Sequence, residues 1–140
     1  SIGMGQHFAA AAEGKTGYVT RADCARAAAA ALMQETGSSV LDITGPAALS
    51  QSDIAAFLSE ISGKDIPYIP ISTDDLVQAM IGAGLPEFMA KVFASFDEAM
   101  AKDYLSVATG DLEKLTGQAG QSARDFLIAN KAALLTPPAQ

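Results

Sequence analysis

The sequence contains no tryptophan, one cysteine and one histidine among its 140 residues. Because Cys24 has no partner within the chain, a disulfide-stapled fold is excluded. Lys and Arg number 9 against 16 Asp and Glu, and the resulting net charge of −7 argues against a general nucleic-acid surface. No apolar run approaches the roughly 20 residues that a membrane-spanning helix requires. With 49% hydrophobic and 18% charged residues, the chain is not intrinsically disordered.

This length and composition predict one globular unit over 1–140, with a lead-in segment over 1–16 and a tail at 136–140. The chain starts at Ser1 without an initiator methionine, in a glycine- and alanine-rich stretch. No secretion-type pattern of charged and then apolar residues opens it. We therefore expect a soluble, cytoplasmic unit that derives from a longer protein.

Helix-capping signals, Ser or Thr followed three residues later by Asp, precede most of the apolar helical patterns. They predict helices that begin after Thr20, Ser50, Ser72 and Ser122 and end near Gly37, Gly63, Gly82 and Pro137. A longer helix is predicted from Pro86 to about Lys102, and a short one over Asp111–Leu115. The long helix carries one apolar stripe, made of Phe88, Met89, Val92, Phe93, Phe96 and Met100. It is interpreted as a core face, with a surface for a flat apolar substrate as the alternative.

Short apolar segments predict three strands, at Gly17–Thr20, Ser39–Thr44 and Ile66–Ile71, the last an edge strand because of its two prolines. The fold class is therefore mixed α/β and helix-rich. The Ala27–Ala31 run is apolar on all sides, so its helix should be buried on more than one face. Three short strands cannot cover that many apolar helix faces, and a packing partner is missing.

The local motifs do not identify a chemistry. Gly14-Lys15-Thr16 resembles the end of a phosphate-binding loop, but Ala9 stands where the pattern needs glycine, so a turn into a strand is the better interpretation. His7 and Cys24 are too few for a metal site and are interpreted as packing and surface residues rather than a catalytic dyad.

The paired acids are interpreted as structural as well. Asp75 caps the helix that starts after Ser72, and Asp74 suits the positive end of the same helix. Asp97 and Glu98 point about 100° apart on their helix and cannot face one substrate together.

A resemblance appears in the stretch from Gly14 to Ala25. Together with the Thr-Gly-Pro element at 44–46, the segment Gly63–Tyr68 and the turn Gly82–Glu87, it resembles the C-terminal half of NmrA-like atypical short-chain dehydrogenase/reductases. The resemblance is strongest to the branch of type 2 NAD(P)H:quinone oxidoreductase and triphenylmethane reductase. The glycine fingerprint of the N-terminal Rossmann half is absent from these residues.

The resemblance implies that the parent protein is an NAD(P)H-dependent oxidoreductase that reduces quinone-like or flat aromatic acceptors. NADPH or NADH would lie on the missing Rossmann half, which would be this chain's main partner. This chain, inactive and without a cofactor by itself, would self-associate and would line the acceptor pocket with Phe8, Tyr18, Phe93 and Phe96. A dinucleotide-sensing regulator without turnover, or a stand-alone helical interaction module, remains an alternative.

Overall fold

The computed structural model describes residues 1–34 and 37–136, so the predicted tail lies outside the described residues except for Thr136. In chain order the elements are β1 His7–Ala9, β2 Lys15–Thr16, α1 Arg21–Gln34, β3 Leu49–Ser50, α2 Gln51–Ser62, β4 Tyr68–Pro70, α3 Thr73–Gly82, α4 Glu87–Ala101, α5 Asp111–Thr116, α6 Ala123–Ala129 and α7 Lys131–Leu135. Helices dominate and the strands are short, which confirms the helix-rich mixed α/β class.

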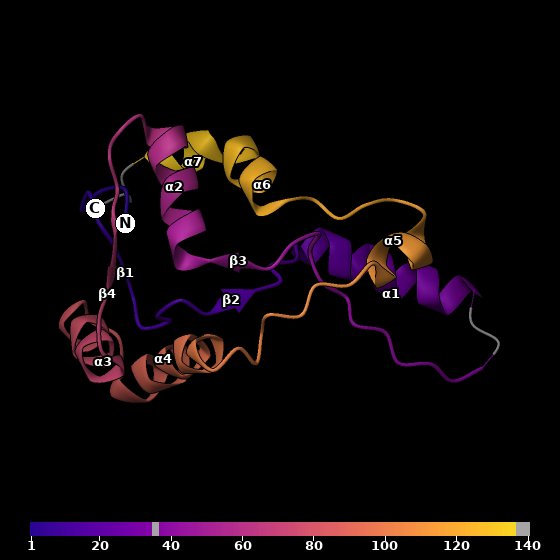
Figure 1. Cartoon of the computed structure of the whole chain (residues 1–140), viewed down its shortest axis with the longest axis horizontal. Helices are drawn as coiled ribbons and strands as arrows, with labels where there is room; N and C mark the ends of the chain where they lie inside the picture. The colour runs from indigo at the N-terminus through magenta and orange to yellow at the C-terminus, as the bar shows by residue number, and fades with distance from the viewer. Residues whose placement is uncertain (35–36, 137–140) are drawn as a thin grey trace.

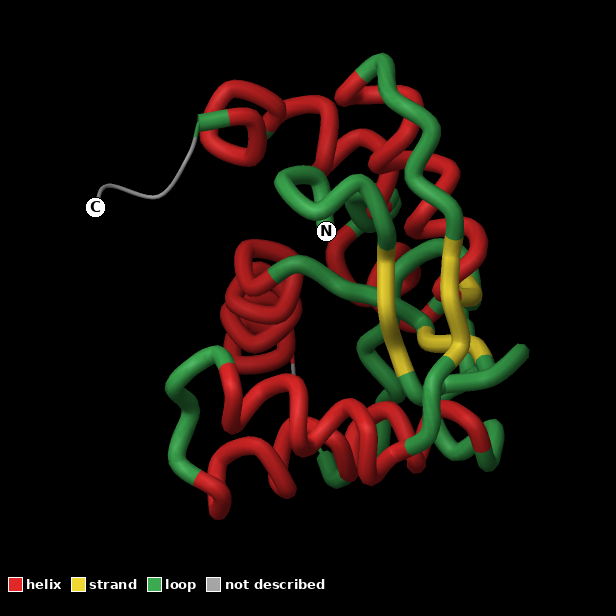
Figure 2. Tube along the Cα trace, turned by 90° about the vertical axis from the view of Figure 1, so that its left-hand side faces the viewer, coloured by secondary structure: helices red, strands yellow, loops and turns green. Residues whose placement is uncertain are grey.

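The strands form two separate pairs. β1 and β4 pair in parallel, with His7 opposite Tyr68, and β2 and β3 pair antiparallel, with Lys15 opposite Ser50. In Figure 2 the parallel pair stands between the helices at one end of the molecule. The predicted strand at 66–71 is therefore confirmed over its central residues.

The other two strand predictions are wrong. Residues 17–20 lie outside any strand, since the pairing with β3 covers Lys15 and Thr16, just before them. Residues 39–44 do not form a strand with any described residue. β1 and β3, three and two residues long, were not predicted from the sequence.

The predicted helix starts are confirmed by their caps. Ser50 and Asp53 form a reciprocal capping box at α2, while Ser72 and Ser122 each accept a backbone N–H at the start of α3 and α6. Thr20 does the same for α1 through the N–H of Asp23, at 3.0 Å. The last predicted helix is interrupted at Asn130, which separates α6 from α7.

Two apolar clusters form the core, and the helices that carry them lie toward opposite ends of the parallel strand pair (Figure 1). Leu58, Ile61 and Ile66 form the core beneath α2, with Leu127 of α6 against it. Val77 of α3 packs against two alanines of α4, Ala90 and Ala94, which are 0% and 1% exposed. The two helices approach closely because these residues are small.

The predicted apolar stripe of α4 is therefore wrong as a core face. Phe88 is 74% exposed and Phe96 57%, and only Met100 of the stripe is buried. α4 packs against α3 through Ala90 and Ala94, so its phenylalanines face solvent.

α1 is also more exposed than predicted. Asp23 and Ala27 are its buried residues, while Leu32 and Met33 are each 87% exposed. In Figure 1 α1 and α5 lie side by side at one end of the molecule, away from the other helices.

Candidate functional site

Tyr18 lies where the chain passes from β2 into α1. The segment Thr44–Pro46 crosses over it so closely that a Cβ at Gly45 would overlap the carbonyl oxygen of Tyr18. Only glycine fits this crossing, which gives a physical reason for the Thr-Gly-Pro element. The crossing fixes the backbone beside the half-buried phenol of Tyr18.

A chain of hydrogen bonds joins this phenol to β1. The amide nitrogen of Gln51 lies 3.3 Å from the Tyr18 hydroxyl and 3.6 Å from the sulfur of Met100. The amide oxygen of Gln51 accepts from Nε2 of His7 at 2.8 Å, and Nδ1 of His7 lies 2.9 Å from the hydroxyl of Ser1. Gln51, 8% exposed, therefore holds Tyr18 and His7 in fixed positions.

Asp97 of α4 adds a negative charge near this chain of hydrogen bonds. Its carboxylate accepts the backbone N–H of Ala10 at 2.8 Å and so ties α4 to the segment after β1. Burial, and secondly the charge of Asp97, raises the pKa of the Tyr18 phenol above its ordinary value of 10.0. The same two causes, in the same order, raise the pKa of Tyr68 on β4. Both phenols therefore stay protonated and neutral at neutral pH.

An apolar cavity of about 470 Å³ opens on the other side of Tyr18, between the start of α1, α2 and α6. Its walls are made by Tyr18, Val19, Ala22, Ile54, Ala123, Phe126 and Leu127, with Thr20, Arg21 and Gln121 as polar members. This volume and lining are typical of sites for small apolar molecules. The cavity can bind a flat, weakly polar ligand.

The four predicted pocket residues do not share this cavity. Tyr18 lines it, whereas Phe8 lies on β1, 37% exposed, and Phe93 and Phe96 lie on α4, 44% and 57% exposed. The bond between Ala10 and Asp97 brings β1 and α4 together, so Phe8, Phe93 and Phe96 belong to neighbouring elements. Their role in binding an acceptor stays a prediction.

His7 and Cys24 are engaged in different places. His7 bonds Gln51, whereas Cys24 lies exposed on α1. Among residues 1–34 and 37–136, no group of three or more His, Cys, Asp and Glu side chains is placed to hold a metal ion. No described helix is long and apolar enough to span a membrane.

The remaining motifs have structural roles. The N–H of Gly14 donates to the carbonyl of Ala11 in a turn that leads into β2, as predicted. A Cβ at Gly14 would overlap the backbone of Met100. Asp75 accepts from the cap residue Ser72, as predicted. Glu98 pairs with Lys102 at 2.6 Å, away from the contact that Asp97 makes.

Sequence reasoning missed Gln51 and the central role of Asp97. Gln51 stands between two capping residues and carries no sequence signal of burial. Asp97 could have been noticed as an acid inside an apolar helix whose neighbour Glu98 already has an (i, i+4) partner in Lys102.

Comparison with known proteins shows a consistent group of relatives, although no family model matches the chain. NAD(P)H azoreductase of Xenophilus azovorans is 31% identical over 92% of this chain and 46% of its own length. Quinone oxidoreductase 2 of Escherichia coli is 36% identical over 81% of this chain and 40% of its own length.

Solved structures agree with these relatives. The NADPH-dependent quinone oxidoreductase of Escherichia coli, complexed with NADPH, superposes with a TM-score of 0.83 at 31% identity, over 96% of this chain and 47% of that one. Triphenylmethane reductase of Citrobacter sp., complexed with NADP(H), gives a TM-score of 0.85 at 28% identity, over 94% and 46%. The chain matches one half of these oxidoreductases. It spans about half the length of these relatives, consistent with the C-terminal half that the sequence resembles.

Three helix starts and the Gly14 turn do not fit a dinucleotide, the ligand in both solved complexes. Pyrophosphate is bound by free backbone N–H groups at a glycine-rich helix start. Here Ser50, Ser72 and Ser122 already cap the helices that follow them, and Gly14 is closed against α4. That the chain alone binds no NADPH stays a prediction.

Proposed function

We propose that this chain is the acceptor-binding portion of an NAD(P)H-dependent oxidoreductase that reduces quinone-like or flat aromatic acceptors. The observation that carries the proposal is the apolar cavity beside Tyr18, in a chain whose relatives are named as quinone, azo and triphenylmethane reductases. The cofactor, NADPH or NADH, would be held by the remaining part of the parent protein. A cytoplasmic location is part of the proposal.

The contribution of this chain is to bind and orient the acceptor and to exclude water from it. Aromatic and aliphatic walls favour a flat ring, because stacking and burial contribute without requiring a charge on the ligand. The Tyr18 phenol, kept neutral by burial and by Asp97, forms part of the cavity wall without adding a charge. Holding the acceptor and the nicotinamide close together in a fixed orientation is itself expected to accelerate the reaction strongly.

The test is steady-state kinetics of the longer protein that carries this sequence, with a simple quinone as acceptor and NADPH as donor. Phe93→Ala, Phe96→Ala and Tyr18→Ala are expected to raise KM for the quinone several-fold and to leave NADPH affinity unchanged. Phe88→Ala is the matched control, since Phe88 is the most exposed phenylalanine of the same helix, at 74%.

Two results would contradict the proposal. If the longer protein reduces no quinone or dye with either nicotinamide, the oxidoreductase assignment fails. If it does but the three variants keep wild-type acceptor kinetics, Tyr18, Phe93 and Phe96 do not bind the acceptor.

A further inference from the structure

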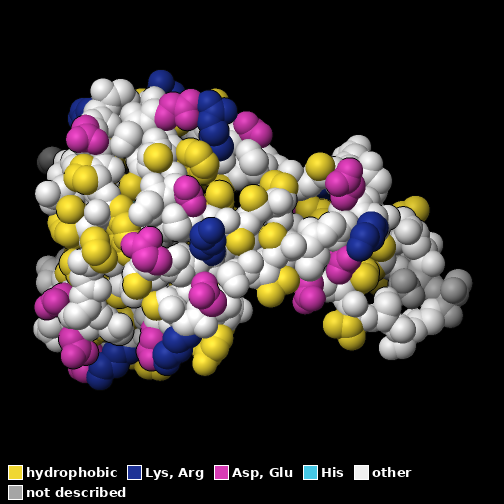
Figure 3. Space-filling model, in the orientation of Figure 1, with side chains coloured by type: hydrophobic (Ala, Val, Ile, Leu, Met, Phe, Trp, Pro, Cys, Tyr) yellow, Lys and Arg dark blue, Asp and Glu magenta, His cyan; other side chains and the backbone are white. Residues whose placement is uncertain are grey.

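The cavity beside Tyr18 has a single charged side chain in its wall, that of Arg21. The other lining residues are aromatic, aliphatic or uncharged polar, and no described Asp or Glu is among them. Figure 3 shows acidic side chains spread over the whole visible face of the chain, which carries 16 Asp and Glu against 9 Lys and Arg. A cavity lined by a cation and by no acid favours a ligand of negative charge, even on an acidic protein.

The guanidinium of Arg21 is available to such a ligand. Arg21 is exposed at the first position of α1, and no carboxylate of the described part of the chain pairs with it. The other two arginines are engaged, since Arg26 pairs with Asp23 at 2.6 Å. Arg124 pairs with Glu60. A guanidinium offers a planar fork of N–H donors that matches the oxygens of a carboxylate or a sulfonate.

The acids near the cavity do not cancel this charge. Asp23, two positions after Arg21, is 6% exposed, and its carboxylate accepts from the guanidinium of Arg26. Asp125 of α6 accepts from the hydroxyl of the cap residue Ser122. Neither acid lines the cavity. The wall therefore keeps the positive charge of Arg21.

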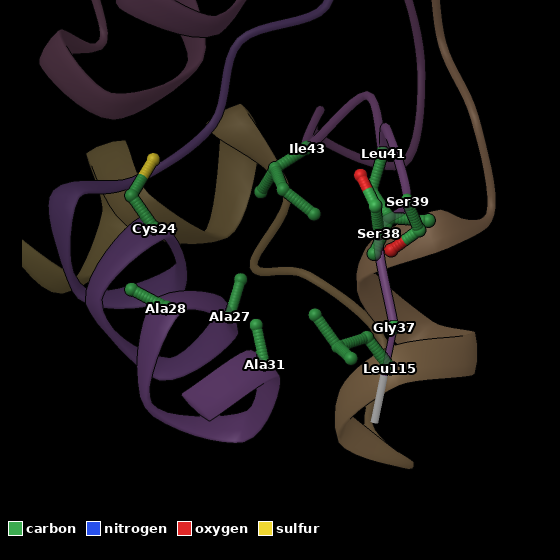
Figure 4. A pocket seen from close by; sticks show the side chains of 10 residues that line it. All are labelled: Cys24, Ala27, Ala28, Ala31, Gly37, Ser38, Ser39, Leu41, Ile43 and Leu115. Atoms are coloured by element: carbon green, nitrogen blue, oxygen red, sulfur yellow. The ribbon is translucent and has the colours of Figure 1, made fainter. Parts of the chain in front are cut away.

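A second apolar hollow, beside α1, lacks this feature. Figure 4 shows its lining, in which alanines of α1 face Leu41, Ile43 and Leu115, with no charged side chain among the described residues around it. This hollow is open to solvent and has no group that selects a ligand by its charge. Sites for small molecules combine apolar walls with a few placed polar or charged groups. The cavity beside Tyr18 has that combination.

We propose that the cavity beside Tyr18 selects flat aromatic acceptors that carry one negative group, a sulfonate or a carboxylate. The ring lies against the apolar wall that includes Ile54, Phe126 and Leu127, and the negative group pairs with Arg21. The ring gains from burial, while the charged group keeps its contact with water and gains a paired guanidinium. Arg21 is then a specificity-determining residue. This inference rests on the proposed function, because it names the class of acceptor for the same cavity.

The test compares two acceptors that differ in charge, in the longer protein that carries this sequence, with NADPH as donor. Naphthoquinone is neutral, and naphthoquinone sulfonate adds one negative group to the same rings. The KM of a variant is divided by the wild-type KM for each acceptor, so that the different reactivities of the two quinones cancel. Arg21→Gln is expected to raise the KM of the sulfonate about tenfold more than that of the neutral quinone. An equal effect on both quinones would overturn the inference.

Charge reversal gives a result that a merely structural role of Arg21 does not produce. Arg21→Glu is expected to raise the KM of the sulfonate further and to lower the KM of a cationic triphenylmethane dye, whereas damage to the fold would weaken both. Arg21→Lys keeps the charge and should retain part of the preference for the sulfonate. Lys64→Gln is the matched control, because it removes one exposed positive charge that does not line the cavity. It should change the KM ratio of the two quinones by less than about twofold.

Equilibrium binding separates this inference from the proposed function. Naphthalene sulfonate and the neutral naphthalene sulfonamide are titrated by calorimetry into the same preparations, with saturating NADP⁺ to occupy the dinucleotide site. Tighter binding of the sulfonate that Arg21→Gln abolishes, in a protein that reduces no quinone, would support the charged site and reject the reductase activity. Reduction of both quinones with an unchanged KM ratio in Arg21→Gln would do the reverse.

Discussion

Asp23 joins the start of α1 to the segment before α6. It is 6% exposed, and its two carboxylate oxygens accept the N–H of Gln121 at 2.9 Å and the guanidinium of Arg26 at 2.6 Å. Arg26 continues to Gln118 at 2.7 Å. The carboxylate thus joins the first turn of α1 to the segment that leads into α6.

Asp23→Asn keeps the size of the side chain but leaves only one acceptor oxygen. Either Gln121 or Arg26 then faces an amide NH₂ group, and that donor loses its partner. The lost charge-assisted bond and the unsatisfied donor together are expected to lower the free energy of unfolding by about 2–4 kcal/mol. This is a large fraction of the roughly 5–15 kcal/mol that holds a domain together.

Urea unfolding followed by far-ultraviolet circular dichroism measures this effect, and suits a protein without tryptophan. With a slope of about 1–3 kcal/mol per molar urea, the midpoint should fall by roughly 1–2 M. Asp75→Asn is the matched control, because the exposed Asp75 caps α3 and should change the free energy by no more than about 1 kcal/mol. Equal midpoints for Asp23→Asn and the wild type would refute the assigned role.

The pH dependence gives a second check on Asp23. Burial raises the pKa of its carboxyl, but the bonds from Gln121 and Arg26 outweigh burial and hold the pKa below the ordinary value of 3.8. A depressed folded-state pKa contributes stability above the unfolded pKa, and this contribution is lost as the pH falls through the folded pKa. The difference in unfolding free energy between the wild type and Asp23→Asn should therefore be largest at pH 7 and shrink below about pH 4. A gap that widens on acidification would contradict this reasoning.

Four further outcomes are expected. Gly45→Ala should cost more than about 2 kcal/mol of unfolding free energy in the urea assay, since a Cβ would overlap the carbonyl of Tyr18. Ser50→Ala should cost about 1 kcal/mol in the same assay, through loss of the capping box, and an unchanged midpoint would contradict its role. Cys24→Ser should keep quinone turnover of the longer protein within about threefold, and a loss of several orders of magnitude would make Cys24 a nucleophile. Calorimetric titration of the chain alone with NADPH should give no binding heat, and micromolar binding would disprove this.

The helices could be predicted from the sequence because their signals are local. Ser50, Ser72 and Ser122 each precede an Asp three positions on, and each caps a helix in the structure. Which face a helix buries is not a local property. α4 packs against α3 through Ala90 and Ala94 instead of its larger aromatic residues, because only small side chains fit between two closely spaced helices.

The candidate site was less predictable than the helices. Tyr18 could be singled out from the sequence, but its partner Gln51 lies 33 positions away and becomes relevant only when α2 is placed against β1. The electrostatic effect of Asp97 on Tyr18 and Tyr68 likewise depends on the bond to Ala10 that brings α4 to this place. Contacts between distant segments, rather than residue types, create these properties.

The failed strand at 39–44 and the exposed α1 have one physical cause. A helix satisfies its backbone hydrogen bonds within itself, so α1 forms even where its alanine faces find nothing to cover them. A strand depends on a neighbour, and residues 39–44 meet one only on the Asp42 edge, where Thr109 and Asp111 supply side-chain partners. A predicted helix should therefore form even where no neighbour covers it, whereas a predicted strand should form only where a neighbouring strand is present. Of the two wrongly predicted strands, only 39–44 combines backbone groups that bond no described residue, those of Leu41 and Ile43, with an apolar hollow beside it.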